Sequence, residues 1–336
     1  MTRALHLHRA GPLITVQDLG RPGYLARGLS RGGAADRLAL RQGAALLGQA
    51  AGAALEMAGL GGSFTVTAPT RIALTGAPMR VRRDGTALAW NTSHLLSPGE
   101  RLEIGAVEDG VYGYLTLGGG IATDPVLGSR AAHLTAGIGR LLADGDRLPL
   151  GPDEGAGTGL ALTDRPHTGG GTIRILPTAQ TALFAPEDRV RFEATAFHRD
   201  GPGNRQGVKL AGGDPIAAQG QRSLLSETVQ PGDIQMIGAG VPYVLLSECQ
   251  TMGGYPRIAT VLPDDLPRVA QAAPGDRLRF RFVTLDEALA DHARQRPGGR
   301  FKIGTRRLLR DPAEMADLLS HQLISGVTDG RGEGEE

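Results

Sequence analysis

The sequence predicts a mainly β protein built from two barrel-like halves with only a few short helices. Short apolar stretches recur along the 336 residues, with turn-forming residues between them. Glycine is frequent, at 51 residues, and proline reaches 21, without a repeat period. Such a composition favours many short strands joined by tight turns. Hydrophobic residues make up 40% of the chain, which is enough to form a buried core.

The predicted strands are identified by alternating apolar residues and β-branched side chains. They cover residues 63–69, 70–76, 101–107, 111–119, 171–177, 233–238, 242–248 and 277–283. One pattern recurs three times, at residues 98–102, 144–148 and 274–278: a Pro-Gly or Asp-Gly turn, an acid-base pair and a leucine. Each copy predicts a turn that enters a strand. Its return late in the chain favours an origin of the two halves by duplication. Such turns also occur in unrelated β proteins, so an independent origin of the repeated turns stays open.

Three segments have helical patterns. Residues 35–48 are rich in alanine and contain several leucines, which predicts a helix with Asp36 as its N-terminal cap. Residues 266–273 predict one or two turns, with Pro267 near the start. Residues 311–323 begin with a capping box and form one apolar face.

These patterns divide the chain into four parts. We expect an N-terminal β domain over residues 1–150, a turn-rich linker over 151–171, a second β domain over 172–285 and a helical tail over 286–336 whose end is disordered.

Composition excludes several classes of function. With a net charge of +1, the protein has no overall electrostatic field that would attract nucleic acid or a membrane surface. The single cysteine, Cys249, excludes an intramolecular disulfide and is expected to be a packed thiol. There is no signal peptide or membrane-length apolar run, so a soluble, cytoplasmic protein is expected. We find no phosphate loop or nucleophile elbow, and His6 and His8 are interpreted as strand residues, so no metal site is expected.

Three glycine-rich loops carry the candidate polar groups. The first, residues 11–36, holds Gln17, Asp18, Arg21 and Asp36; the second, 201–210, holds Asn204 and Arg205; the third, 248–256, places Gln250, Thr251 and Tyr255 around Gly253 and Gly254. Each loop can be explained as turns and caps. Each also suits a small polar ligand, because arginine and amide groups recognise anions and carbonyls, and glycine lets the backbone approach closely.

Together these loops resemble one family. The run TVQDLGRPG at residues 15–23, Asn-Arg-x-Gly at Asn204, Arg205 and Gly207, and QTMGGYP at residues 250–256 occur in the order of the allophanate hydrolase subunit 2 family. That family includes the C-type subunit of 5-oxoprolinase and the carboxyltransferase half of urea carboxylase. The resemblance spans about residues 5 to 283. The chain departs from the family pattern at residues 29–33, at Val208-Lys209, and at Glu248-Cys249, where an Asp-Arg pair is expected.

The resemblance implies two cyclophilin-like β-barrel domains that work in a hetero-oligomer. The implied partners are a subunit 1 (B-type) protein and a further, A-type protein. The implied activity is ATP-dependent opening of 5-oxo-L-proline to L-glutamate, with ATP and magnesium bound in the complex. Two alternatives stay open. One is a carboxyltransferase that uses carboxybiotin, and the other is a non-catalytic regulatory partner of subunit 1.

The resemblance also assigns roles to residues of this chain. Asn204 and Arg205 are expected to contact the substrate anion or carbonyl, Gln250 to donate a hydrogen bond, and Tyr255 to form a wall with a polar tip. The expected substrate or nucleotide contacts are Gln17, Asp18, Arg21, Asp36, Gly207, Thr251, Gly253 and Gly254.

Overall fold

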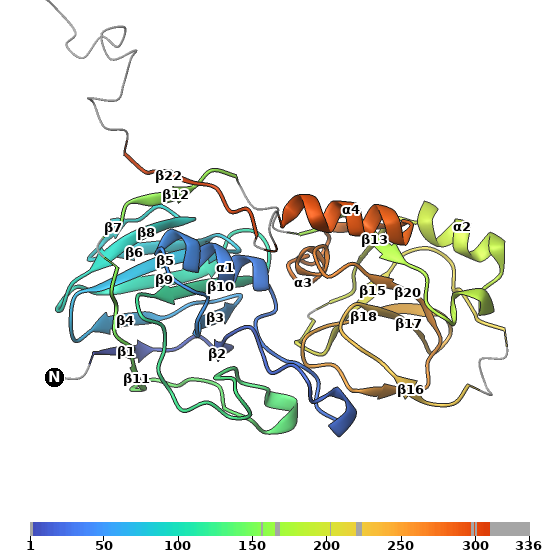
Figure 1. The fold of residues 1–336 in the computed structure, drawn as a ribbon, viewed down its shortest axis with the longest axis horizontal. Helices are drawn as coiled ribbons and strands as arrows, with labels where there is room; N and C mark the ends of the chain where they lie inside the picture. Colours follow the sequence, from blue (N-terminus) through green and yellow to red (C-terminus); the bar gives the residue numbers. More distant parts are fainter. Residues whose placement is uncertain are drawn as a thin grey trace, which may run out of the picture.

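The computed structural model describes residues 3–155, 157–164, 169–201, 203–219, 224–296, 299 and 301–309. Strands dominate it, so the mainly β prediction is confirmed (Figure 1). The N-terminal half contains two large sheets, and the C-terminal half contains a closed barrel. No described helix is both long and apolar enough to cross a membrane.

One sheet of the N-terminal half has six strands in the order β11-β1-β4-β9-β6-β7. Their bounds are β1 (Ala4–Arg9), β4 (Ser63–Val66), β6 (Met79–Arg83), β7 (Thr86–Ala87), β9 (Leu102–Val107) and β11 (Arg147–Pro149). The other has seven strands in the order β2-β3-β10-β5-β8-β12-β22. These are β2 (Ile14–Gln17), β3 (Ala54–Ala58), β5 (Thr70–Gly76), β8 (Thr92–Leu96), β10 (Tyr112–Leu117), β12 (Leu160–Leu162) and β22 (Thr305–Arg307). Apolar residues from both sheets form one buried cluster, because alternate side chains of each strand point inward.

The barrel closes in the order β13-β20-β17-β18-β15-β14-β21, with β13 and β21 paired in parallel. Its strands are β13 (Gly171–Leu176), β14 (Phe197–Arg199), β15 (Gly207–Ala211), β17 (Asp233–Ile237), β18 (Val241–Leu245), β20 (Arg257–Val261) and β21 (Arg277–Phe282). A separate pair joins β16 (Glu227–Thr228) to β19 (Met252–Gly253). Phe192, Phe197 and Phe280 pack together inside this half, with ring centroids 5.0–5.9 Å apart.

The helices are short, as expected. They are α1 (Arg37–Leu46), α2 (Pro186–Ala194), α3 (Leu266–Ala270) and α4 (Leu285–Gln295), with single turns η1 (Leu25–Arg27), η2 (Leu134–Ala136) and η3 (Thr181–Leu183). Asp36 caps α1 as predicted, accepting a hydrogen bond of 2.9 Å from the backbone N–H of Ala39. The sequence pattern does not predict α2, because its apolar periodicity is weak.

The three repeated turns each lead into a strand, namely β9, β11 and β21. Their glycines, Gly99, Gly145 and Gly275, all have positive φ, between 85° and 96°. Only glycine adopts this conformation without steric cost, which explains its place in the pattern. The two halves nevertheless differ among the described residues, since the C-terminal half forms a closed barrel and the N-terminal half forms two sheets.

The tail is not helical throughout. After α4 it continues into β22, which pairs with β12 of the N-terminal half (Figure 1). The segment predicted as a linker therefore includes a strand of its own, β12. The helix predicted at residues 311–323 and the predicted disordered end lie outside the described residues.

Asp153, within the predicted linker, is fixed to the N-terminal half by Arg71. The Arg71 guanidinium donates to both carboxylate oxygens, at 2.9 and 2.5 Å, and it also donates to the backbone oxygen of Leu47 at 2.7 Å. This bidentate pair lowers the pKa of Asp153. The start of the linker is thereby held against β5.

We expect Asp153→Asn to lower the free energy of unfolding by about 1–3 kcal/mol at pH 7, because it weakens a charged hydrogen bond. The pKa of Asp153 is lower in the folded state, so its contribution is complete above the unfolded-state pKa and is lost as pH falls through the folded-state value. Urea unfolding at pH 7 and pH 3 should therefore show a difference between wild type and variant that shrinks in acid. A difference that stays constant would contradict this role for the Asp153 charge.

Candidate functional site

A cavity of about 510 Å³ lies at the junction of the two halves. Its N-terminal walls come from β2, β3, β10 and the η2 turn, and its C-terminal walls come from β14, the Asn204-Arg205 loop and the chain that follows β18. The lining residues are Leu13, Thr15, Glu56, Ala58, Gly59, Val107, Gly110, Val111, Tyr112, Leu134, Thr135, Leu141, Arg199, Gly203, Asn204, Arg205, Gln206, Glu248 and Pro274. The volume falls within the ~300–1,000 Å³ typical of small-molecule sites, and the walls combine apolar surface with a few polar groups.

Arg205, in the wall of this cavity, joins the two halves. Its Nη1 pairs with Glu56 on β3, its Nε donates to Glu248 at 2.5 Å, and its Nη2 donates to the backbone oxygen of Gly33 at 2.6 Å. Burial lowers the pKa of Arg205, but the two carboxylates outweigh burial and the net shift is upward. Arg205 is therefore a permanently charged bridge whose hydrogen-bonding groups are used within the protein.

Glu56 connects this bridge to the start of α1. Its Oε2 accepts hydrogen bonds from the Tyr114 hydroxyl at 2.6 Å and from the backbone N–H of Ala35 at 2.8 Å. The Tyr114 hydroxyl in turn accepts from the backbone N–H of Asp36 at 2.7 Å. Asp36, expected to contact the ligand, is instead a buried helix cap, and burial raises its pKa.

Gln271, at the end of α3, forms a second link between the halves. Its side-chain amide donates to Asp36 at 3.0 Å and to the backbone oxygen of Tyr112 at 2.9 Å. Its oxygen accepts from the backbone N–H groups of Val111 and Tyr112 at 3.0 and 2.8 Å. Because these bonds are buried, they hold the cavity-lining end of β10 against the C-terminal half.

On the other side of Arg205, Glu248 connects to the η2 turn. Its Oε2 accepts from the backbone N–H and the hydroxyl of Thr135, at 3.3 and 3.2 Å, and lies 3.9 Å from His133 Nδ1. The other ring nitrogen of His133 bonds to the hydroxyl of Ser30 at 2.8 Å. Burial lowers the pKa of His133. Ser30 is buried and does not line the cavity, so this Ser-His-Glu series supports the wall and offers no accessible nucleophile.

Tyr112, on β10, lines the cavity among these charges. Burial raises the pKa of its phenol to about 12, with Glu56 adding to the shift and Arg205 and Arg199 opposing it. The hydroxyl therefore stays protonated at neutral pH, and a protonated phenol is able to donate a hydrogen bond.

The polar residues of the first loop brace the backbone behind the cavity. Gln17 donates to the backbone oxygen of Ala132 at 3.2 Å, and Arg21 donates to that of Ala131 at 2.5 Å. Asp18 accepts from the Ser129 hydroxyl at 2.6 Å and from the Arg130 N–H at 2.7 Å. These three side chains hold the segment that leads into η2, and none of them lines the cavity.

Of the candidate residues in the second loop, Asn204 and Arg205 line the cavity, and Gly207 does not. Asn204 Oδ1 accepts from the backbone N–H groups of Gln206 and Gly207, at 2.8 and 3.2 Å, and so shapes the loop that carries Arg205. Gly207 begins β15, where an added Cβ would lie 2.2 Å from the Tyr243 ring.

Only Glu248, at the start of the third loop, lines this cavity, and the candidate residues at positions 250–255 lie apart from it. Gln250 donates to Gln235 of the barrel at 3.2 Å, and Gly253 pairs with Glu227 in the two-stranded β16–β19 sheet. Tyr255 is 47% exposed. Like these three residues, Thr251 and Gly254 are absent from the cavity wall. Cys249, next to Glu248, is buried at 2% exposure, and burial raises its pKa to about 12.

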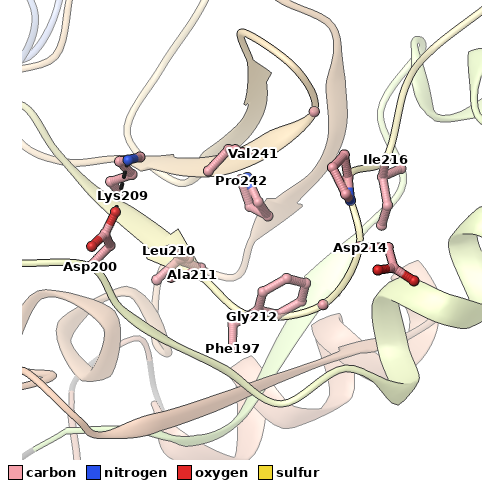
Figure 2. Close-up of a pocket in the computed structure, with 13 residues that line it drawn as sticks. Phe197, Asp200, Lys209, Leu210, Ala211, Gly212, Asp214, Ile216, Val241 and Pro242 are labelled. Carbon is pink, nitrogen blue, oxygen red and sulfur yellow. Dashed lines mark ion pairs between the residues drawn. The ribbon is translucent and has the colours of Figure 1, made fainter.

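A smaller cavity of about 220 Å³ lies on the barrel, between β14, β15 and the start of β18 (Figure 2). Lys209 and Asp200 at its edge form an ion pair at 2.8 Å, and both side chains are about half exposed. The charge of Lys209 is therefore already balanced, and none of the candidate residues from the three loops lines this cavity. The junction cavity is the better candidate site.

Several residues of the site were not predicted. Glu56, Tyr112, Thr135 and Arg199 lie on apolar stretches or in segments without a motif, so nothing local in the sequence marks them. Glu248 is different, because the departure from the family pattern at Glu248-Cys249 falls on the carboxylate that binds Arg205. Within the described residues, no group of three or more His, Cys, Asp or Glu side chains is placed to hold a metal ion.

The two-sheet half, the barrel and the cavity between them define a mainly β protein with a candidate small-molecule site at the junction of its halves. Residues 27–282 match the family described as "Carboxyltransferase domain, subdomain A and B", and the chain belongs to that family. It is 37% identical to the C-type subunit of 5-oxoprolinase from Escherichia coli (strain K12), over 85% of this chain and 93% of that protein.

Two further similarities involve longer proteins. The crystal structure of TTHA0988 superposes with a TM-score of 0.76 at 31% identity, over 83% of this chain and 56% of that one. The urea amidolyase of Lachancea kluyveri is 27% identical over 85% of this chain, which spans only 17% of that protein.

Proposed function

We propose that this chain is the C-type subunit of an ATP-dependent 5-oxoprolinase complex that opens 5-oxo-L-proline to L-glutamate. The observation that carries the proposal is the junction cavity, which combines apolar walls with Tyr112, Asn204 and the Glu56–Arg205–Glu248 bridge. The similarity to the Escherichia coli 5-oxoprolinase chain, over nearly the whole of that protein, supports the same assignment.

The chemistry calls for a hydrogen-bond donor at the reacting carbonyl carbon of the lactam. A lactam is a stable amide, and phosphorylation of its oxygen by ATP activates the carbon toward water. Water adds to that carbon, the C–N bond breaks with the ring nitrogen leaving as the amine, and hydrolysis of the resulting acyl phosphate releases L-glutamate and phosphate. Groups preorganised toward the oxygen that water brings to this carbon stabilise the charge that develops on it. In the proposed site the protonated Tyr112 hydroxyl is this donor. Arg205 does not bind substrate directly, because its nitrogens already bond to Glu56, Glu248 and Gly33.

We place the nucleotide, with its magnesium, toward the partner proteins. The arginines of the cavity wall are Arg199 and Arg205, and the Arg205 charge is balanced by two carboxylates. A largely apolar wall with one remaining cation suits a single carboxylate better than a triphosphate. Leu13, Leu134 and Leu141 line the cavity although they are 37–52% exposed, so an apolar rim is available to a B-type or A-type partner.

The test is reconstitution with the B-type and A-type proteins, 5-oxo-L-proline and ATP-magnesium. We expect glutamate to form only when all three proteins and ATP are present, and omission of this chain is the matched control. An assembled complex that forms no glutamate would contradict the proposal.

The alternative is carboxyl transfer from carboxybiotin to urea or a related acceptor, which the family description and the similarity to a urea amidolyase favour. In that reaction the cavity would hold the ureido ring of biotin and the acceptor. Binding of biotin at the junction, together with an inactive 5-oxoprolinase mixture, would support transfer. A complex that binds neither ligand but inhibits its B-type partner would support the regulatory role.

A further inference from the structure

Arg199 is a buried cation in the wall of the junction cavity. It ends β14 and is only 5% exposed. Its Nη1 donates to the backbone oxygen of Ala272 at 2.6 Å, and its Nε has no hydrogen-bond partner in the described structure. Among the described residues, no carboxylate lies within ion-pair distance of it, whereas Arg205 in the same wall is paired twice.

A buried guanidinium without a counter-ion is costly, because desolvation is not offset by an opposite charge. Burial accordingly lowers the pKa of Arg199, with Tyr112 and Asp276 only partly opposing it. Arg21 is also buried without an ion pair in the described residues, but it lines none of the cavities described above. Arg199 therefore combines an unbalanced buried charge with access to a cavity.

The loop glycine before Asn204 makes room for this side chain. A Cβ built on Gly203 would lie 2.3 Å from Arg199 Nη2 and 3.0 Å from its Cζ. Gly203 itself lines the cavity, so the backbone of the Asn204-Arg205 loop lies directly against the guanidinium. Any side chain at this position would displace the Arg199 head group.

The rest of the wall indicates the body of the ligand. Leu13, Val111, Leu134, Leu141 and Pro274 surround the cavity with apolar surface. A cation at one side of an apolar cavity is complementary to a small organic monoanion with a compact, uncharged body. A doubly charged acid would leave one charge against apolar wall.

We propose that Arg199 binds the carboxylate of a small cyclic amide in the junction cavity and sets the preference for a carboxylate-bearing substrate. This rests on the proposed function, in which that substrate is 5-oxo-L-proline. The guanidinium pairs with the carboxylate, and the lactam ring then lies against the apolar wall with its carbonyl toward Tyr112. Arg199 thus acts as a specificity residue, and Arg205 supports the wall.

The test compares Arg199→Met with wild type in the reconstituted complex. Methionine keeps an apolar stem of similar length but removes the charge. Loss of a charge-assisted hydrogen bond, worth about 1.5–3 kcal/mol, should raise KM for 5-oxo-L-proline roughly 10- to 150-fold. The inhibition constant of 2-pyrrolidinone, the same lactam without the carboxylate, should change less than about threefold. The KM of Arg199→Lys for 5-oxo-L-proline should lie between those of wild type and Arg199→Met.

Two further variants keep the test decisive. Gly203→Ala should raise KM in the same selective way by displacing the guanidinium, even if Arg199→Met folds poorly. Arg279→Met removes an exposed arginine from β21 and should leave both constants unchanged. An unchanged KM in Arg199→Met, or equal weakening of the two lactams in both cavity variants, would overturn the assignment.

Failure of the proposed function would be seen separately. If the wild-type complex forms no glutamate, calorimetric titration of this chain with 5-oxo-L-proline and with 2-pyrrolidinone still tests Arg199. Carboxylate-dependent binding that disappears in Arg199→Met would support the anion site without oxoprolinase activity. Absence of carboxylate-dependent binding in the wild type would overturn the site itself.

Discussion

Arg205→Ala is expected to lower the free energy of unfolding by about 3–5 kcal/mol, because it leaves two buried carboxylates without their shared cation. Glu56 and Glu248 come from different halves, and each has a side chain only 2% exposed. The truncation therefore weakens the junction and the cavity wall together. Urea unfolding followed by circular dichroism gives the stability change, and turnover of the reconstituted complex should fall in parallel.

Two companion variants identify the cause. Arg140→Ala removes an arginine that is 61% exposed and paired with Asp146, and it should cost no more than about 1 kcal/mol. The triple variant Glu56→Gln, Arg205→Met, Glu248→Gln removes the charges together and should recover much of the stability but not the turnover. An Arg205→Ala protein with wild-type stability and turnover would show that the bridge has neither role.

Tyr112→Phe is expected to lower kcat about 10²–10³-fold with little change in KM, because it removes one preorganised donor from the developing oxyanion. The ring still fills its buried position, so the unfolding midpoint should stay close to that of wild type. Steady-state kinetics of the reconstituted complex, together with a thermal melt, separate these effects.

Tyr24→Phe is the matched control, since Tyr24 does not line the cavity, and it should leave kcat unchanged. Tyr255→Phe compares the two candidate locations of the site. A large loss of kcat in Tyr255→Phe, with none in Tyr112→Phe, would move the ligand from the junction to the third loop.

The pattern of the sequence predicts the fold class well, for local physical reasons. The alternation in residues 70–76 and the turn glycines at Gly99, Gly145 and Gly275 act within a few residues, and the structure forms the strands and turns they predict. The weak amphipathicity of residues 186–194 provides no such signal, so α2 was not predicted. The strand β22 was not predicted either, because it forms by pairing with β12, nearly 150 residues earlier in the chain.

Local backbone preferences were enough to predict the mainly β class and the cap of α1. A contiguous motif also singled out the Asn204-Arg205 loop, which lies in the cavity wall. The surroundings of that loop depend instead on long-range packing. The fold brings Glu56, Tyr112 and Arg199 to one cavity from three strands, and it places Gly253 and Tyr255 elsewhere. At the junction between the two halves, charged and apolar residues far apart in the sequence contact one another. Local sequence patterns cannot predict such contacts. Arg205 shows the difference most clearly, since its motif predicts a free anion binder and the fold makes it a neutralised bridge.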